Sequence, residues 1–389
     1  MARPLLLELC MLARNPQLAL SLGLVLLGSL FSSSCKGGPD DPPNTIFDAG
    51  PEAIIDGAII PPDAVPAATA EGIDLLFVID NSNSMREEQA SLVANFNRFV
   101  NVLQELDSGL PDIHIGVVTT NLGAGDNGIA GCEGQGDNGI LVNTPSSNAC
   151  NTPSDRYISD VAGSDGTRIR NYEGTLAETF SCIAEVGVTG CGFEQPLEAM
   201  VRALDGSNPQ NAGFLRPEAL LAVVIISDED DCSATNLGIY NTDPAQDRID
   251  SELGFLSSFR CFEFGVSCNP DTPRTPGARS DCSPRQDSPY MDDIRVYADF
   301  LKGLKDNPGN VVVAGIVGNA SPVSVSLNEG EPRLDASCSS GSGDAAPAVR
   351  LTAFLEQFPD RNTVTTICNE DLSDGLTGIA NLLSNVIGG

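Results

Sequence analysis

Three short apolar runs dominate the hydrophobic pattern of the chain. They cover residues 73–79, 220–227 and 311–317, and each ends in polar or turn-forming residues. A run this short and this apolar is typical of a strand covered on both faces, as in a parallel sheet. Two further strands are predicted at 113–120 and 363–367.

Segments with apolar residues at helical spacing follow these strands. They are predicted as helices at 85–106, from Pro196 to 204, and at 294–304, 347–358 and 372–386. Strands that alternate with helices predict an α/β fold, with a doubly wound, mostly parallel central sheet flanked by helices. Long loop insertions are expected at 121–190, 229–289 and 319–345, with short strands at 140–143 and 167–172.

A cluster of oxygen-bearing side chains follows the first strand. Asp80, Ser82 and Ser84 lie on the turn between this strand and the next helix, at the carboxyl end of a strand, where open α/β sheets place their ligands. One carboxylate and two hydroxyls are hard oxygen ligands, which suit Mg²⁺. The alternative is an ordinary Asx or Ser turn that caps the helix.

The pattern D-x-S-x-S after a buried strand resembles the metal-ion-dependent adhesion site of von Willebrand factor type A domains. The resemblance implies a binding module in which Asp80, Ser82 and Ser84 hold Mg²⁺, or Ca²⁺ or Mn²⁺, and the ion takes a carboxylate from a partner. It also implies an Asp at the end of a neighbouring strand, often acting through water. Asp228, which ends the run at 220–227, matches that position.

The remaining ligand that the resemblance implies is a Thr before the helix at Pro196. Phe193 stands at the usual position, so the match is poor. Thr189 is the preferred candidate and Glu194 the reserve. If Glu194 binds, the ion is more fully neutralised, which favours Ca²⁺ over Mg²⁺.

The chain is strongly acidic. It has 389 residues with 53 Asp and Glu against 21 Lys and Arg, a formal charge of −32. This balance argues against nucleic acid as a partner, because nucleic-acid binders carry basic patches. It also argues against electrostatic docking on anionic lipid. The acidic run 228–231 is expected to be solvated loop charge, with a second cation site as the alternative.

The first 35 residues read as a signal peptide. An apolar core of residues 18–31 follows Arg14, and small residues lead to Cys35. This order resembles a bacterial lipoprotein cleavage site, which implies a lipid on Cys35, although Ser32 stands where Leu is usual. Cleavage nearby without a lipid is the alternative. Residues 36–72, rich in Pro and Asp, are expected to be a flexible tether, and 73–389 the folded domain.

The cysteines indicate export. Without Cys10 and Cys35, ten of the 12 remain, with no C-x-x-C and a single His, which favours disulfides over zinc or redox chemistry. We expect the local pairs Cys132–Cys150 and Cys182–Cys191, and also Cys338–Cys368.

These features together predict a cell-envelope lipoprotein, in the outer membrane or secreted, that binds an extracellular or envelope protein through a metal ion. One alternative is a structural protein whose ion only stabilises a loop. The other is a carboxylate-dependent hydrolase. An enzyme is not expected, since the sequence has no G-x-S-x-G, no H-E-x-x-H and no Gly-rich phosphate loop. His114, within a strand, is expected to be structural.

Overall fold

The computed structural model describes most of the chain after residue 67. It covers residues 68, 70–106, 109–145, 150–341 and 343–388, and also 54–55 and 58–59. The expected signal peptide, Cys35 and most of the expected tether lie outside these residues. Within the tether, β1 (Ile54–Ile55) pairs with β2 (Ala58–Ile59) as an antiparallel hairpin. This hairpin belongs to a separate unit, Met1–Pro62.

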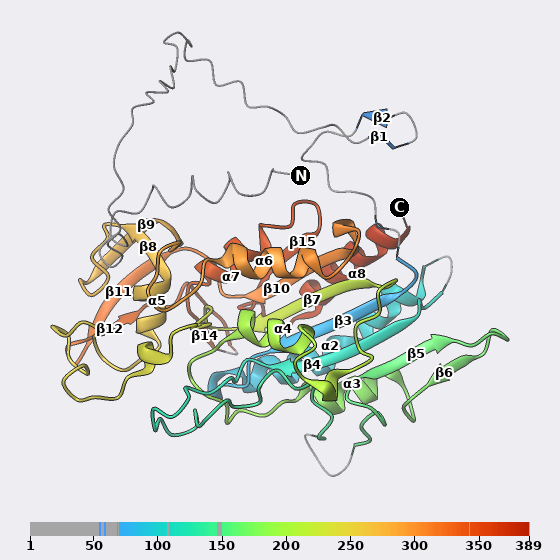
Figure 1. Ribbon diagram of the computed structural model, residues 1–389, viewed down its shortest axis with the longest axis horizontal. Coiled ribbons are helices and arrows are strands. Elements are labelled where there is room, and N and C mark those ends of the chain that lie inside the picture. Colours follow the sequence, from blue (N-terminus) through green and yellow to red (C-terminus); the bar gives the residue numbers. More distant parts are fainter. Residues whose placement is uncertain are drawn as a thin grey trace, which may run out of the picture. The chain divides into compact units, whose positions relative to one another are not determined.

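A seven-stranded sheet forms the centre of the second unit, in the order β15-β10-β7-β3-β4-β5-β6 (Figure 1). The first five of these strands are parallel, whereas β5 and β6 extend one edge in antiparallel fashion. The predicted fold class is confirmed. The strands are β3 (Ile73–Ile79), β4 (Ile113–Thr119), β5 (Ile158–Ala162), β6 (Arg168–Arg170), β7 (Leu220–Ser227), β10 (Val311–Val317) and β15 (Asn362–Thr366).

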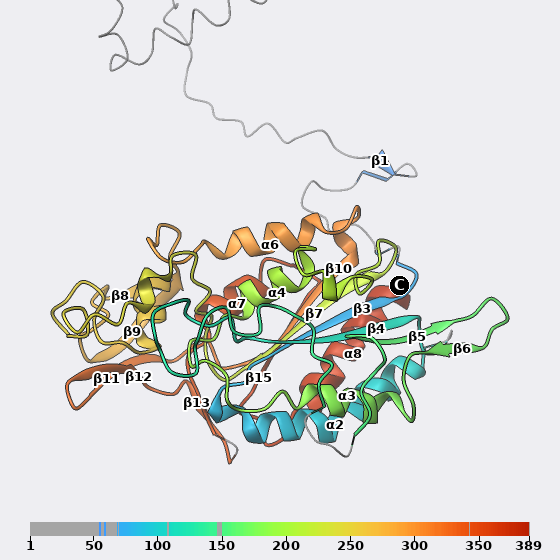
Figure 2. The same cartoon turned by 60° about the horizontal axis from the view of Figure 1, so that its bottom comes forward.

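Helices cover both faces of this sheet (Figure 2). One face carries α2 (Arg86–Gln104), α3 (Leu176–Ala184) and α8 (Ser373–Gly388), and the other carries α4 (Pro196–Leu204), α6 (Ile294–Gly303) and α7 (Val349–Leu355). Leu75, Phe77 and Ile79 of β3 pack on the first face, while Leu76 and Val78 pack on the second. Both sets are buried, which is why the run at 73–79 shows no polar alternation.

The insertions contain more regular structure than the sequence predicted. A second, antiparallel sheet has the order β12-β11-β9-β8, and a small hairpin joins β13 to β14. Their bounds are β8 (Val266–Asn269), β9 (Gly277–Pro284), β11 (Val323–Asn328), β12 (Glu331–Leu334), β13 (Cys338–Ser339) and β14 (Asp344–Ala345), with α5 (Phe259–Gly265) nearby. Short 3₁₀ turns are η2 (Asn83–Met85), η3 (Pro209–Asn211), η4 (Leu237–Tyr240) and η5 (Pro308–Asn310).

Two details of the insertion at 121–190 differ from the prediction. The helix α3 was expected to be loop, although Thr175 and Glu178 form a capping box at its start. The expected strand at 140–143 is irregular chain, and the amide of Val142 donates to the carbonyl of Val117. The short strand expected at 167–172 is confirmed as β6.

Five disulfides tie the described loops. Cys338–Cys368 is confirmed. The expected pairs Cys132–Cys150 and Cys182–Cys191 are wrong, because the bonds join Cys132 to Cys191 and Cys150 to Cys182. Closeness in sequence was the only guide to those pairs, whereas α3, which carries Cys182, changes the path of the chain between them. The other bonds are Cys232–Cys261 and Cys268–Cys282.

Among the described residues, no helix has the length and apolar content needed to cross a membrane. Disulfides at this density are typical of proteins in oxidising compartments, outside the cell or in its envelope.

Candidate functional site

Asp80 lies where β3 ends beside β7. Ile79 pairs with Ile226, and the amide of Asp80 donates to the carbonyl of Ile226 at 3.0 Å. The Asp80 side chain is fully buried. One carboxylate oxygen accepts from the amide of Ser82 at 2.7 Å, and the other accepts from the hydroxyl of Ser227 at 2.6 Å. The carboxylate is therefore held at a fixed place at the carboxyl edge of the sheet.

The two serines of the motif connect Asp80 with Asp228. The hydroxyls of Ser82 and Ser84 are 3.0 Å apart, and the Ser84 side chain lies beside Asp228, where it lowers the pKa of the carboxyl. Asp228 follows β7 directly, and the negative charge of Asp80 raises the pKa of its carboxyl. The structure thus brings together four of the residues that the sequence singled out. Ser84 is exposed, so the cluster reaches the surface there.

Glu194, the reserve candidate, lies among these carboxylates. It is 1% exposed, and one of its oxygens accepts from the hydroxyl of Thr120 at 2.8 Å. Its other oxygen has no hydrogen-bond partner. Burial raises the pKa of Glu194 well above its usual range, and the charges of Asp80, Glu229 and Asp228 add to this rise.

Thr189, the preferred candidate, lies at the edge of the cluster. Its side chain is exposed, although the next residue, Gly190, donates its amide to the carbonyl of Asn81 at 2.8 Å. The loop therefore passes close to the site. Two buried residues of this loop are Cys191, which forms a disulfide with Cys132, and Phe193, which packs in an apolar cluster with Tyr240. That packing places Glu194, the next residue, inside the protein.

Two further carboxylates belong to the cluster: Glu88, which sequence reasoning missed, and Glu229, which lies in the acidic run 228–231. Glu88, in the first turn of α2, is 5% exposed, and one of its oxygens is buried without a hydrogen bond. Glu229 follows Asp228 directly. Glu88 lies one helical turn beyond Ser84, so helical spacing was a signal that could have found it.

These carboxyls raise one another's pKa. Burial is the largest cause throughout. For Asp228, burial and then the charge of Asp80 raise the pKa to about 7. For Glu229, burial and the charges of Asp80 and Asp228 raise the pKa to about 8. In the described part of the chain none of the five forms an ion pair with Lys or Arg, so their negative charges are uncompensated by neighbouring side chains.

The residues fit a divalent cation. Buried carboxylate oxygens without partners occur on Asp228, Glu194 and Glu88, and a buried amide oxygen without a partner occurs on Asn81. Such atoms are costly to leave unpaired, and a cation would compensate them. Among described residues, no three His, Cys, Asp or Glu side chains are arranged to hold one ion by themselves. Serine hydroxyls and water would therefore have to supply part of the coordination, which suits Mg²⁺.

In chelator, we expect the protein to become less stable as the pH rises from about 5 to about 8. Asp228 and Glu229 have folded-state pKa values of about 7 and about 8, above their usual 3.8 and 4.5. Protonation therefore stabilises the folded state at low pH, and this contribution disappears as the pH passes through those values. Chemical denaturation in EDTA at several pH values measures the fall. The Asp228→Asn variant should lose less stability over this pH range than the unchanged protein, whereas the variant with the exposed substitution Asp306→Asn should lose as much. An equal dependence of stability on pH in the two variants would contradict the expectation.

The rest of the acidic run is structural, and the expectation of solvated loop charge is wrong. Asp230 accepts the backbone amides of Arg350 and Leu351 at the start of α7 at 2.9–3.0 Å. Asp231 is 1% exposed and pairs with the buried guanidinium of Arg350 at 3.1 Å. These contacts fix the chain just after Asp228.

His114 is placed as a structural residue, as expected. Its Nδ1 donates to the carbonyl of Phe214 at 2.9 Å and lies 3.7 Å from Asp74. Burial lowers the pKa of its imidazole.

Comparison with known proteins gives only distant structural likeness. No protein-family model matches the chain, and no curated protein matches its sequence. Proximal thread matrix protein 1 from the mussel byssus is 12% identical with a TM-score of 0.34, over 83% of this chain and 49% of its own. A von Willebrand factor type A protein from Catenulispora acidiphila is 11% identical with a TM-score of 0.32. The match covers 82% of this chain and 43% of that protein. The conserved hypothetical protein BatB from Bacteroides thetaiotaomicron is 12% identical with a TM-score of 0.29, over 82% and 100%.

The chain spans about half, or less, of the length of the first two proteins.

Proposed function

We propose that the chain is a binding module that captures a protein ligand through a divalent cation. Asp80, Ser82 and Ser84 would hold the ion, with Asp228 and Glu194 behind it, and the ligand would supply a carboxylate. Mg²⁺ is preferred as long as Glu194 does not bind the ion directly, and Ca²⁺ is favoured if Glu194 is a ligand. Mn²⁺ is the other candidate. The observation that supports this most is the meeting of Asp80 and Asp228 at neighbouring strand ends, with the hydroxyls of Ser82 and Ser84 between them.

The chain's own groups explain how an outside ligand could take part. When bound, the cation supplies positive charge that attracts a carboxylate. Ser227 and the amide of Ser82 orient Asp80. The side chain of Ser84 lies next to Asp228. Because Ser84 and Asn83 are exposed, a partner can approach from their side. This chemistry is binding, and it requires no nucleophile.

A location in the cell envelope agrees with the five disulfides, and a lipid on Cys35 remains part of the proposal. The partner would then be an extracellular or envelope protein.

A structural role for the ion is the second candidate. Glu194, Glu229 and Glu88 add negative charge to the cluster, and more carboxylates could enclose the ion completely. The two candidates differ in whether a coordination position stays open to the partner.

Capture of proteins from envelope extract on the immobilised chain tests the proposal. We expect a partner to bind in Mg²⁺, to be released by EDTA, and to be lost in Asp80→Asn. Asp306→Asn, an exposed substitution of the same kind, should bind like the unchanged protein. Capture that persists in EDTA, or that Asp80→Asn leaves intact, would overturn it.

A further inference from the structure

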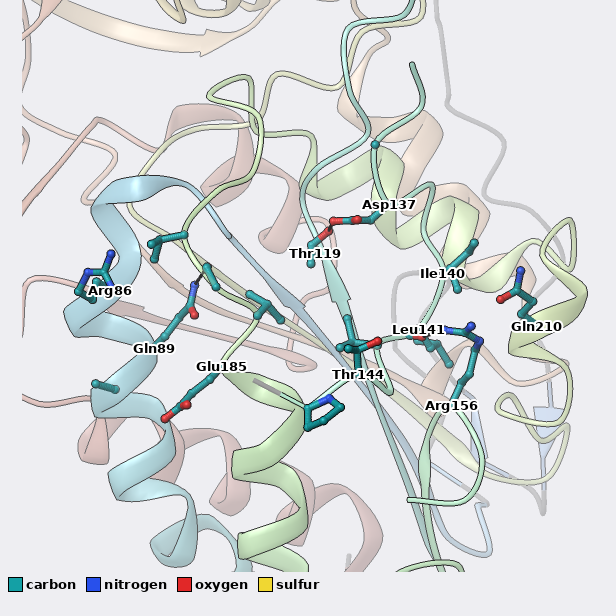
Figure 3. A pocket seen from close by; sticks show the side chains of 17 residues that line it. Arg86, Gln89, Thr119, Asp137, Ile140, Leu141, Thr144, Arg156, Glu185 and Gln210 are labelled. Atoms are coloured by element: carbon teal, nitrogen blue, oxygen red, sulfur yellow. Dashed lines mark hydrogen bonds between the residues drawn. The ribbon is translucent and has the colours of Figure 1, made fainter. Parts of the chain in front are cut away.

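A large pocket lies next to the proposed metal site and has no role in the account so far. It measures about 820 Å³ and lies between the start of α2, the end of β4 and the loops around residues 140 and 187 (Figure 3). Gln89 connects the two sites, because its side-chain nitrogen Nε2 donates to the backbone carbonyls of Asp80 and Gly187, both at 2.9 Å. A ligand that reaches Asp80 from outside therefore has this pocket beside it.

The walls of the pocket are mixed in character. Ile140, Val142, Val186 and Val188 are half-buried apolar residues along it. Such a lining, with a few placed polar groups, is typical of sites that bind small molecules or peptide side chains. The volume also falls in the usual range for such sites, roughly 300–1,000 Å³.

The pocket has charged side chains on both of its sides. Figure 3 shows Arg86, Gln89 and Glu185 on one side and Arg156 on the opposite side. Arg156 donates to the carbonyl of Leu141 at 2.9 Å, and among described residues it forms no ion pair with a carboxylate. Asp137, which also lines the pocket, accepts from the hydroxyl of Thr119 at 2.6 Å. The far end thus presents an unpaired guanidinium, in a chain that has only 21 cationic residues.

We infer that the pocket receives an extended peptide segment of the partner that carries a second carboxylate, and that Arg156 binds it. The first carboxylate is the one that completes the metal site, so this inference rests on the proposed function. Apolar residues between the two acids would contact the valine and isoleucine walls. A guanidinium can bind a carboxylate through two parallel hydrogen bonds, and this bidentate geometry gives directional specificity.

Selection of random displayed peptides on the immobilised full chain tests this inference. Binding takes place in Mg²⁺ and release is by EDTA. We expect the enriched peptides to share two acidic residues at a constant spacing with apolar residues between them. On Arg156→Gln, the second acid should disappear from the enriched set while the first remains.

A synthetic peptide from that selection then provides a thermodynamic cycle. Arg156→Gln, or amidation of the second acid, should each weaken binding about tenfold, as expected for a hydrogen-bonded charge pair. When the Arg156→Gln variant binds the amidated peptide, the affinity should fall no further than it does for either change alone. Arg156→Lys should give an intermediate loss, because it keeps the charge without the bidentate geometry. Arg98→Gln, an exposed cation on α2, should have no effect.

The outcomes separate this inference from the proposed function. Enriched peptides with one acid, bound equally by Arg156→Gln, would overturn the role of the pocket and leave the metal site standing. A failure to recover any EDTA-released peptide would overturn both.

Discussion

Replacing Asp80 by asparagine is expected to weaken divalent-cation binding by about a hundredfold or more, since even residues that only support metal ligands contribute about 10–100-fold. The same change should leave the metal-free protein at least as stable. Asparagine keeps an acceptor for the amide of Ser82 and can place its amino group against the hydroxyl of Ser227. It also removes one of the like charges that raise the pKa of Asp228 and Glu194.

Thermal denaturation and metal titration of the same samples measure both parts of this prediction. In EDTA the midpoint of Asp80→Asn should equal or exceed that of the unchanged protein. In excess Mg²⁺ the unchanged protein should gain stability by mass action, and the variant should gain none. A variant that unfolds earlier in EDTA but still binds the cation would show that Asp80 is only a structural turn residue.

Replacing Arg350 by methionine is expected to destabilise the protein by about 3–5 kcal/mol, because it leaves the charge of Asp231 buried without its partner. Both side chains of this pair are fully buried. The guanidinium donates twice to one Asp231 oxygen at 3.1 Å. The other Asp231 oxygen accepts the amide of Leu197 at the start of α4 at 3.2 Å. The pair therefore connects α7 with α4 beneath the proposed site.

A double-mutant cycle separates the pair from the individual side chains. Asp231→Asn should also destabilise, and the combination with Arg350→Met should cost much less than the sum of the two. Urea denaturation in EDTA is the measurement, with the exposed Arg295→Met as control. Additive losses, or a loss below about 1 kcal/mol for Arg350→Met, the level of exposed pairs, would contradict the description of this pair.

The sequence was sufficient to predict the parallel sheet and the meeting of Asp80 with Asp228. The strands β3, β7 and β10 are buried along their whole length and are almost entirely apolar, with Asp74 and Ser227 as polar exceptions, because helices cover both of their faces. Parallel strands bring their carboxyl ends to one edge, so two acids that follow neighbouring strands must converge there.

Other parts depend on contacts that are distant in sequence. The strand β5 alternates buried and half-buried residues and contains the buried Asp160, which pairs with Arg168 and Arg170. Short strands of this kind have no apolar run to reveal them. The choice between Thr189 and Glu194 depends on the path of one loop, which the Cys132–Cys191 bond and the packing of Phe193 determine.

The second sheet escaped prediction for a related reason. Most residues of β9 are exposed or half-buried, so its hydrophobic pattern resembles that of a loop. It pairs with β8 as a local hairpin, but its register with β11 is determined by pairing across a long stretch of chain.

A crystal structure of the protein grown with Mn²⁺, using the anomalous signal of the metal, is the most direct test of the central claim. The account predicts one peak beside Asp80, Ser82 and Ser84, near Asp228, with at least one coordinating water on the exposed side of Ser84. No peak at this place, or an ion coordinated entirely by protein oxygens, would contradict a binding role for the site.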